Sequence, residues 1–459
     1  MKETCRTIAV LLISAAGCTS QPSGAISDAR AQSTQAAAKV SSDRSPDSSS
    51  APDSPTARGG GAPARPAAGI RLVYDLDWDG ARTERRAQCL GEVVRSLGVA
   101  LGLQAESELV MARATLEALQ ARAEWSLVEG AADQLRLRLL KREDAKQLDP
   151  SFEARLKSCA ALEHSRAEWI FQVRMPSTPE QRAQAASAVA AVVQRRLNEL
   201  AVPASVEPVA ARVALLCGGV DEGTFAKVRA TVERRGKLEF RVVRDDEDFI
   251  GLALQRVPPP WPEGIGLGQL ESVPVGDGPV RSVHFATLPP VAHETAVVAR
   301  ARLAAVLGTL PTPADRALLL SARTEYDEAT RSAVPNGWRS YYVQAWAELG
   351  NDGLRTATAT APSSSGDAQV ALEFTEEGGR AFAALTADQV RRRMAIVLDD
   401  VVQTVPIVMQ RIGGGHAIIT MGSAEPARAA EQAAELALVL RTGALPYGLL
   451  LASEELVGR

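Results

Sequence analysis

The segment VALEFTEEGGRAFAAL, residues 370–385, decides the fold class of this chain. Apolar and other side chains alternate over 370–374, which predicts a strand with one buried face. Thr375 then predicts the N-cap of a short helix that carries Phe382 and Leu385 on its apolar side. A strand followed at once by a helix is typical of a mixed α+β fold.

The residues after this segment continue the alternation of strands and helices. Met394 begins a short continuous apolar run, which is typical of a strand covered on both faces. Gly443 and Pro446 together predict a helix stop. The expected elements are a second capping box at Thr386 and Gln389, a strand over 394–398, a turn at 413–415, a strand over 417–421 and a helix over about 424–442.

Upstream, strands and helices follow one another in a pattern that a ferredoxin-like layer requires. A strand, a helix and a strand are followed by a second, less similar copy. The clearest helix begins at Thr178, with Pro179 after it and Gln181 closing a capping box. The expected strands are 70–76, 135–139, 169–173, about 206–216 and 237–242, and the expected helices are 83–98, 105–128, 178–200 and about 222–234.

Residues 246–337 interrupt this regularity. A proline-rich run and a glycine-rich run break any periodicity there, which predicts an irregular connection with one helix near 313–333.

Composition limits the classes of function. The chain has 459 residues, of which 46% are hydrophobic and 23% charged, enough for two or three cores. This excludes collagen-like, fully disordered and polytopic membrane proteins. A net charge of −4 leaves no basic footprint for nucleic acid, and 4% aromatic residues give no indication of an aromatic cofactor cage.

The N-terminus reads as a targeting segment. Lys2 and Arg6 precede a short apolar run, 8–13, that is too short to span a bilayer. Ser-Ala-Ala-Gly before Cys18 resembles a bacterial lipobox, so Cys18 is the expected lipid-bearing N-terminus of the mature chain; the alternative is an ordinary signal peptide with a chance cysteine. Residues 18–69, rich in Ser, Ala, Pro and Gly, are expected to be a disordered tether. We therefore expect a chain tethered to a membrane and without a transmembrane helix.

Three cysteines remain after Cys5 and Cys18 are set aside. Cys89, Cys159 and Cys217 are odd in number and have no C-x-x-C spacing, so neither a disulfide framework nor a zinc site is expected. One pair could form in an oxidising compartment, but buried free thiols are the favoured state.

Several short blocks of the sequence resemble the periplasmic base and head segments of SecD, a subunit of the Sec preprotein translocase. The blocks occur in the same order and at similar spacing as in SecD. The base block is ERRGKLEFRVV, 233–243. The head blocks are FTEEGGRAF (374–382), LT (385–386), MAIVLD (394–399), PI (406–407), Ile412, GG (414–415) and LRTGALP (440–446). The resemblance covers about 169–245 and 340–458, whereas 70–165 matches in pattern alone. Two features differ from the family. SecD couples to the proton gradient through intramembrane carboxylates, for which we find no counterpart. This chain also has Asp400 where the family usually has Gly.

The resemblance implies a ferredoxin-like base layer, with an inserted α+β head and a final strand that returns to the base. The expected parts are a lipoprotein signal peptide (1–17), the tether (18–69), the base (70–245), the irregular connection (246–337), the head (338–446) and the returning strand (447–459).

No pattern indicates catalysis, a cofactor or a metal site. Asp399 and Asp400 are adjacent on an extended chain and point to opposite faces, so a turn is the favoured interpretation over a carboxylate pair. Residues 391–393, three arginines near a helix end, are expected to be solvated. The four histidines are expected on the surface or in loops, without metal-ligand spacing: His164, His284, His293 and His416.

A binding role is the leading hypothesis. The resemblance implies contact with unfolded exported polypeptide, which needs a strand edge or an apolar groove. Val405, Ile407 and Met409 occupy alternate positions and are candidates for one wall of such a groove, although core packing is the favoured explanation. We expect a periplasm-facing, lipid-anchored, non-catalytic export protein that contacts exported chains or the translocon, with the outer membrane slightly favoured because Thr19 follows Cys18. The alternative is a structural envelope lipoprotein without a role in secretion.

Overall fold

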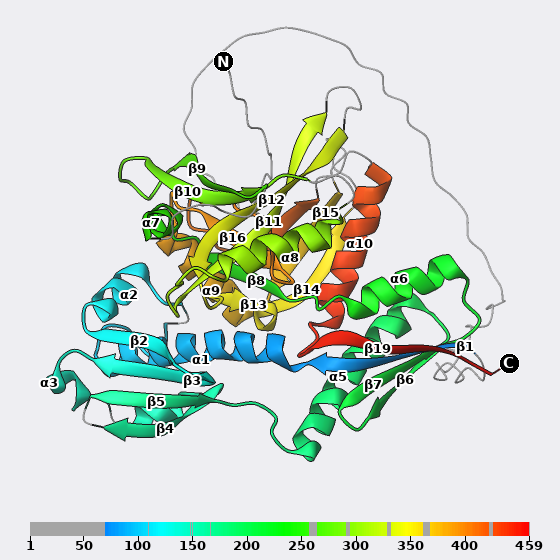
Figure 1. The fold of residues 1–459 in the computed structure, drawn as a ribbon, viewed down its shortest axis with the longest axis horizontal. Coiled ribbons are helices and arrows are strands. Elements are labelled where there is room, and N and C mark those ends of the chain that lie inside the picture. The colour runs from blue at the N-terminus through cyan, green and yellow to red at the C-terminus, as the bar shows by residue number, and fades with distance from the viewer. Residues whose placement is uncertain are drawn as a thin grey trace, which may run out of the picture. The chain divides into compact units, whose positions relative to one another are not determined.

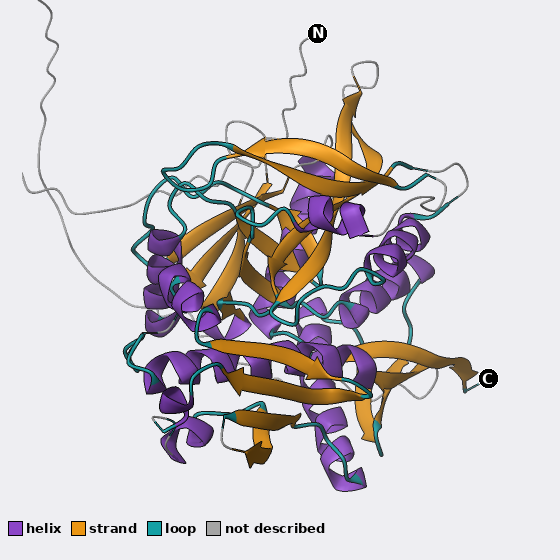
Figure 2. Cartoon of the chain, turned by 60° about the vertical axis from the view of Figure 1, so that its left-hand side comes forward, coloured by secondary structure: helices purple, strands orange, loops and turns teal. Residues whose placement is uncertain are grey.

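The computed structural model describes residues 69–108, 110–146, 148, 150–165, 167–256, 264–290, 294–327, 332–360, 368–421 and 426–458. The expectations for the signal peptide, for Cys18 and for the tether up to residue 68 lie outside these residues. The described part is a mixed α+β structure with four sheets, and helices lie against the strands (Figure 2). The α+β class predicted from the sequence is thereby confirmed.

The base is a four-stranded antiparallel sheet in the order β19-β1-β7-β6. Its strands alternate with two helices in the pattern strand-helix-strand-strand-helix-strand, which is the ferredoxin-like arrangement expected from the sequence. Leu72, Tyr74 and Leu215 on the strands pack with Val189 and Val193 of the first helix. The elements are β1 (Gly69–Asp77), α5 (Pro179–Leu200), β6 (Ala204–Val209), β7 (Arg212–Cys217), α6 (Glu222–Glu233) and β19 (Gly448–Val457).

Local sequence explains how α5 begins. The Thr178 hydroxyl accepts from the Gln181 amide, and the Gln181 side chain accepts from the Thr178 amide, which confirms the predicted capping box. By contrast, the single strand expected near 206–216 is a hairpin, because the chain turns at Ala210 with a φ of 54° and β6 pairs with β7.

A second antiparallel sheet, β2-β3-β5-β4, forms an inserted module over residues 101–173. In Figure 1, α1 runs from β1 alongside the strands of this module. The helix expected over 105–128 ends early, because residues from Ala123 onward pair with β3. The elements are α1 (Trp78–Ala100), α2 (Arg113–Gln120), β2 (Ala123–Val128), β3 (Ala131–Leu139), α3 (Arg142–Ala145), α4 (Pro150–Ala154), β4 (Cys159–Ser165) and β5 (Glu168–Val173).

A disulfide joins this module to α1. Cys89 and Cys159 are bonded, with their Cα atoms 5.5 Å apart, while Cys217 is a buried free thiol. The expectation of three free thiols was wrong for this pair, since pairing depends on a contact between residues far apart in the chain.

The described residues of 246–337 form regular elements, whereas an irregular connection was expected there. They contain α7 (Phe249–Arg256), β9 (Gly266–Val273), β10 (Arg281–Leu288) and α8 (Ala296–Leu307), followed by β11 (Arg316–Asp327) and the start of β12 (Ser332–Gln344). The helix expected near 313–333 was wrong. Residues 316–327 form β11 instead, because β12 and β17 pair with β11 along its two edges and this long-range pairing overrides local propensity.

The largest sheet has eight strands in the order β13-β8-β16-β17-β11-β12-β10-β9. Beyond β8, Val243 pairs with Val343 of β12, and the Arg244 amide donates to the Tyr342 carbonyl at 2.9 Å. Strands β8, β16, β17, β11 and β12 therefore close into a five-stranded ring. Its interior holds small apolar side chains such as Val243, Ala395 and Val402. The new elements are β8 (Leu238–Val242), β13 (Leu349–Gly350), β16 (Met394–Leu398) and β17 (Val401–Thr404).

The outer face of β8 and β16 packs on the fourth sheet, β14-β15-β18. Phe240, Phe374 and Phe382 meet there with ring centroids 4.9 to 6.0 Å apart. The apolar run of β16 is buried at every residue, as predicted for a strand covered on both faces. The remaining elements are the 3-10 helix η1 (Asn351–Gly353), β14 (Leu354–Thr360), β15 (Ala368–Phe374), α9 (Glu376–Asp388), β18 (His416–Met421) and α10 (Pro426–Thr442).

The caps of these helices differ from expectation at one site. Thr375 caps α9 by accepting from the Gly378 amide, as predicted. The second capping box was wrong: Thr386 lies inside α9, where its hydroxyl donates to the Phe382 carbonyl and accepts from the Ile412 amide. Gly443, with a φ of 96°, follows α10 where the helix stop was expected.

Candidate polypeptide-contact site at the mouth of the ring

The segment after β17 extends one side of the ring. The Met394 amide donates to the Pro406 carbonyl at 3.0 Å, and the Val408 amide donates to the Arg392 carbonyl at 2.9 Å. Arg393 and Ile407 are therefore directly opposed, and opposed residues of antiparallel strands point to the same face.

Val405, Ile407 and Met409 form a graded apolar row on that face. Val405 packs against the ring interior, Ile407 is 43% exposed and Met409 is 76% exposed. Val408, between them, points the other way and is 3% exposed. The core-packing explanation holds for Val405 but was wrong for Ile407 and Met409. We call Ile407 and Met409 the mouth pair.

Buried charges flank the mouth pair. The Arg393 guanidinium donates to both Asp245 oxygens at 2.7 and 2.6 Å and to Glu271 Oε2 at 2.8 Å. Arg339 donates to the same Glu271 oxygen at 2.7 Å. Burial alone would raise the pKa of the Glu271 carboxyl, but Arg339 and Arg393 outweigh burial and hold that pKa below its usual range. The expectation of three solvated arginines was therefore wrong for Arg393.

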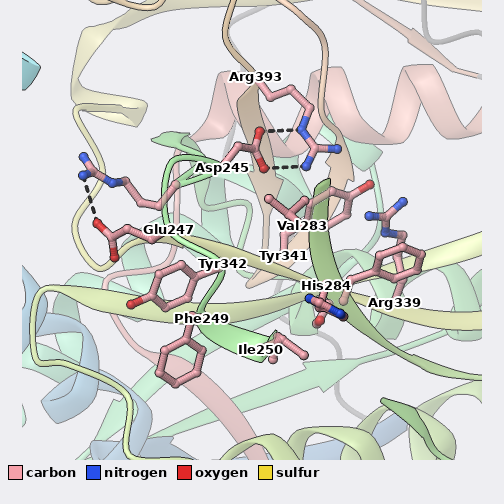
Figure 3. Close-up of a pocket in the computed structure, with 13 residues that line it drawn as sticks. Asp245, Glu247, Phe249, Ile250, Val283, His284, Arg339, Tyr341, Tyr342 and Arg393 are labelled. Carbon is pink, nitrogen blue, oxygen red and sulfur yellow. Dashed lines mark hydrogen bonds and ion pairs between the residues drawn. The ribbon is translucent and has the colours of Figure 1, made fainter. Parts of the chain in front are cut away.

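The cations at the mouth also stack on aromatic rings. Arg339 lies 4.1 Å from the centre of the Phe285 ring and 4.3 Å from that of Tyr341, and Arg393 lies 5.6 Å from the latter. Figure 3 shows Arg393 and Asp245 facing one another beside Tyr341. The cavity among these side chains measures about 20 Å³, which is room for one water molecule. This cavity is therefore too small for a small-molecule ligand, and neither residue of the mouth pair lines it.

A second charged row was missed by the sequence reasoning. Lys237 lies directly before β8, and Glu239 and Arg241 alternate with apolar residues along it, yet Lys237 and all five β8 residues are buried. Lys237 Nζ lies 3.1 Å from Glu84 of α1 and 2.8 Å from Glu239, which also pairs with Arg241 at 2.8 Å. Alternation alone predicts an exposed polar face, and no sequence signal identifies the covering helix.

The other candidate residues have structural positions. Asp399 and Asp400 have φ values of 51° and 60°, which confirms the predicted turn. The Asp399 carboxylate accepts from the Lys237 amide at 2.8 Å, and burial raises the pKa of this carboxyl. Gly414 and Gly415 also have positive φ values, in the turn before β18.

The histidines do not come together. His164 stacks on Trp169, His284 Nδ1 lies 2.7 Å from Asp248 Oδ2, and His416 is exposed at the start of β18. His293 lies outside the described residues. Within the ranges that the structure describes, no group of three His, Cys, Asp or Glu residues is arranged to hold a metal ion.

Helices long and apolar enough to cross a membrane are absent from the described ranges.

Comparisons with known proteins place the mouth pair in a recognised segment. Residues 326–447 match the family model of the SecDF P1 head subdomain, and this match begins before the head expected over 338–446. SecDF of Thermus thermophilus is 43% identical over 93 residues, which are 20% of this chain and 12% of that protein. SecD of Anaeromyxobacter dehalogenans is 29% identical over 242 residues, which are 50% of this chain and 39% of that protein.

Solved structures give a weaker likeness. One, described as a membrane component SecDF that enhances protein export, is 22% identical, with a TM-score of 0.35, over 61% of this chain and 94% of that one. Because the chain covers less than two fifths of these two sequence relatives, the similarity concerns a part of each of them. On the sequence comparisons, residues 326–447 are similar to the SecDF P1 head subdomain, and about half of the chain is similar to a part of SecD.

Proposed function

We propose that this chain is a non-catalytic binding protein of bacterial protein export that contacts unfolded exported polypeptides. The observation that carries the proposal is the exposure of the mouth pair, Ile407 and Met409, on the segment that matches the head subdomain. Met suits a surface that accepts varied sequences, because its flexible, polarisable side chain adapts to different partners.

The rigidity of the mouth supports the same role. Arg393, which lies opposite Ile407, is bound to both Asp245 and Glu271, and these two ion pairs restrain the backbone beside the mouth pair. An extended polypeptide that packs on Ile407 and Met409 would bury apolar area without first ordering the surface that receives it.

We further propose that Cys18 carries the lipid and holds the protein in the cell envelope, facing the periplasm, with the outer membrane slightly favoured. The lipobox-like sequence before Cys18 supports this anchor. The proposal includes no proton-coupled step and no cofactor.

Site-specific photocrosslinking during export tests the contact. A photoreactive residue at Met409 is expected to form adducts with exported chains, whereas one at Leu162, an apolar residue 53% exposed on β4, is not. Adducts from Met409 with resident envelope proteins alone would favour the structural lipoprotein instead. Equal labelling of exported chains from both positions would contradict a specific site.

A further inference from the structure

Several arginines lie together where α1, the start of β3 and the connection from β5 to α5 meet. The Arg85 guanidinium donates to the Arg174 carbonyl at 3.2 Å. Arg86, the next residue on α1, donates to the Ala132 carbonyl at 3.1 Å. The antiparallel register of β3 and β5 brings Ala132 towards Arg174, so these three arginines belong to one part of the surface.

Two aromatic rings link a fourth arginine to this group. Arg85 also donates to the Tyr447 hydroxyl at 3.0 Å, and the centre of the Tyr447 ring lies 5.0 Å from that of Trp78. The Arg182 guanidinium lies 5.6 Å from the centre of the Trp78 ring. The four residues Arg85, Arg86, Arg174 and Arg182 are called here the arginine patch.

The charge of the arginine patch is largely uncompensated. In the described part of the chain, the four side chains have no carboxylate among their hydrogen-bond or ion-pair partners and donate to backbone carbonyls and to Tyr447 instead. Glu180, which shares the first turn of α5 with Arg182, offsets one charge. Other carboxylates on these elements are engaged elsewhere: Asp79 with Arg82, Glu84 with Arg235 and Lys237, Glu92 with the Lys157 and Ser158 amides, and Asp133 with Gln172.

This excess of positive charge is local and does not favour folding. The whole chain has a net charge of −4, so the patch does not reflect a basic composition. Burial lowers the pKa of the Arg86 guanidinium, which shows that its surroundings disfavour the charge. Arg182 lies in the first turn of α5, where the partial positive charge of the helix N-terminus disfavours a cation. Charges that the fold itself disfavours indicate a role outside folding.

Arginine and tryptophan together suit a membrane surface. A guanidinium binds phosphate oxygens through parallel hydrogen bonds, and tryptophan rings prefer the depth of the lipid headgroups. Residues 177–182, which span the start of α5, are all exposed, so a flat surface can reach them. Nucleic acid fits less well, because four cations around one pair of rings form no extended basic stripe.

We propose that the arginine patch and Trp78 form a docking surface for membranes that carry anionic phosphate headgroups. The guanidinium groups of Arg174 and Arg182 meet the headgroup phosphates, and Trp78 lies beside them at the level of the headgroups. This inference does not depend on the proposed function, since it needs neither the mouth pair nor a lipid at Cys18.

Vesicle binding by the full chain with Cys18→Ser, which cannot be acylated at this position, tests the surface. The probes are vesicles of phosphatidylglycerol with phosphatidylcholine and vesicles of phosphatidylcholine alone, in a cosedimentation assay. Arg174→Gln/Arg182→Gln removes two exposed cations of the patch. Arg138→Gln/Arg142→Gln is the matched control, because it removes two exposed cations near the opposite end of β3 and changes the net charge equally.

The parent chain should bind the anionic vesicles and release them as the salt concentration rises. The patch variant should bind about thirtyfold more weakly at low salt, at about fivefold per arginine, and the control should change by less than about threefold. Circular dichroism checks that both variants fold, and if the patch variant does not, Arg182→Gln alone should show the fivefold loss. Equal binding to neutral vesicles, or equal losses in the patch variant and the control, would overturn the proposal and leave an acidic protein as the candidate partner.

Discussion

Cys89, in the middle of α1, is disulfide-bonded to Cys159, the first residue of β4, and the bond closes a separation of 70 residues. It is reinforced by Glu92, whose carboxylate accepts from the amides of Lys157 and Ser158 at 2.7 and 2.8 Å. The inserted module is thus held on α1 by one covalent bond and by one carboxylate a single helical turn further along.

Reduction of this disulfide should destabilise the module. A crosslink across 70 residues lowers the entropy of the unfolded chain, and in the loop-entropy model this stabilises the folded state by about 4 kcal/mol. Urea unfolding monitored by tryptophan fluorescence should show a lower midpoint in the presence of dithiothreitol. The double variant Cys89→Ser/Cys159→Ser should be insensitive to dithiothreitol, and an unchanged midpoint in the parent chain would contradict the prediction.

Asp245→Ala should be strongly destabilising. It leaves the Arg393 guanidinium, whose side chain is 8% exposed, without its bidentate partner, and breaking a buried pair costs about 3–5 kcal/mol. The matched control is Asp277→Ala, which removes the 87% exposed partner of Arg391 and should change the free energy of unfolding by at most about 1 kcal/mol. Similar losses in both variants, measured by urea unfolding, would show that the mouth cluster is not a buried network.

Glu271 should make stability fall in acid. The pKa of the Glu271 carboxyl in the folded state lies below its ordinary value of 4.5. Its contribution to the free energy of unfolding is therefore fully present above pH 4.5 and is lost as the pH falls through the lower folded-state pKa. Glu271→Gln should flatten the pH dependence of the melting temperature below pH 4.5 while also lowering the temperature at pH 7. If the melting temperature of this variant falls with pH as steeply as that of the parent chain, the pH dependence must come from other carboxyls.

Gly236→Ala should cost more than Gly130→Ala. Both glycines have positive φ, 72° and 76°, but a Cβ at Gly236 would lie 2.3 Å from Val439 Cγ1, whereas nothing lies within 4 Å of one at Gly130. Gly130→Ala should therefore show only the backbone cost, about 1–2 kcal/mol, and Gly236→Ala a larger loss. Thermal unfolding of the two variants provides the comparison, and equal losses would mean that Val439 moves aside freely.

Local signals predicted the elements that local chemistry determines. The capping box of Thr178 and Gln181, the cap at Thr375 and the buried run of β16 all depend on residues within a few positions of one another. The alternation of strands and helices also indicated a ferredoxin-like layer with its two helices. However, the expected strands 169–173 and 237–242 are β5 and β8 of other sheets, and β1 and β19 complete the base instead.

Features that depend on distant partners could not be predicted in the same way. The sequence around β11 predicts a helix, but the segment forms a strand because it pairs with β12 and β17. The sequence predicts that Arg393 is solvated, and only the fold brings Asp245 against it. For the mouth pair, the alternation of Val405, Ile407 and Met409 gave the common face, but only the position where β16 begins shows where along that face the side chains become exposed to solvent.

The pairing of β1 with β19 has a consequence for biogenesis. The first strand of the base hydrogen-bonds to the last, from Gly69 opposite Val457 to Asp77 opposite Gly448. During synthesis from the N-terminus, one edge of β1 therefore stays unpaired until β19 has been made. The inserted module can fold earlier, because its strands are close together in the sequence. Such non-local pairing is slow to form, so the base sheet can be completed only after β19 has been synthesised.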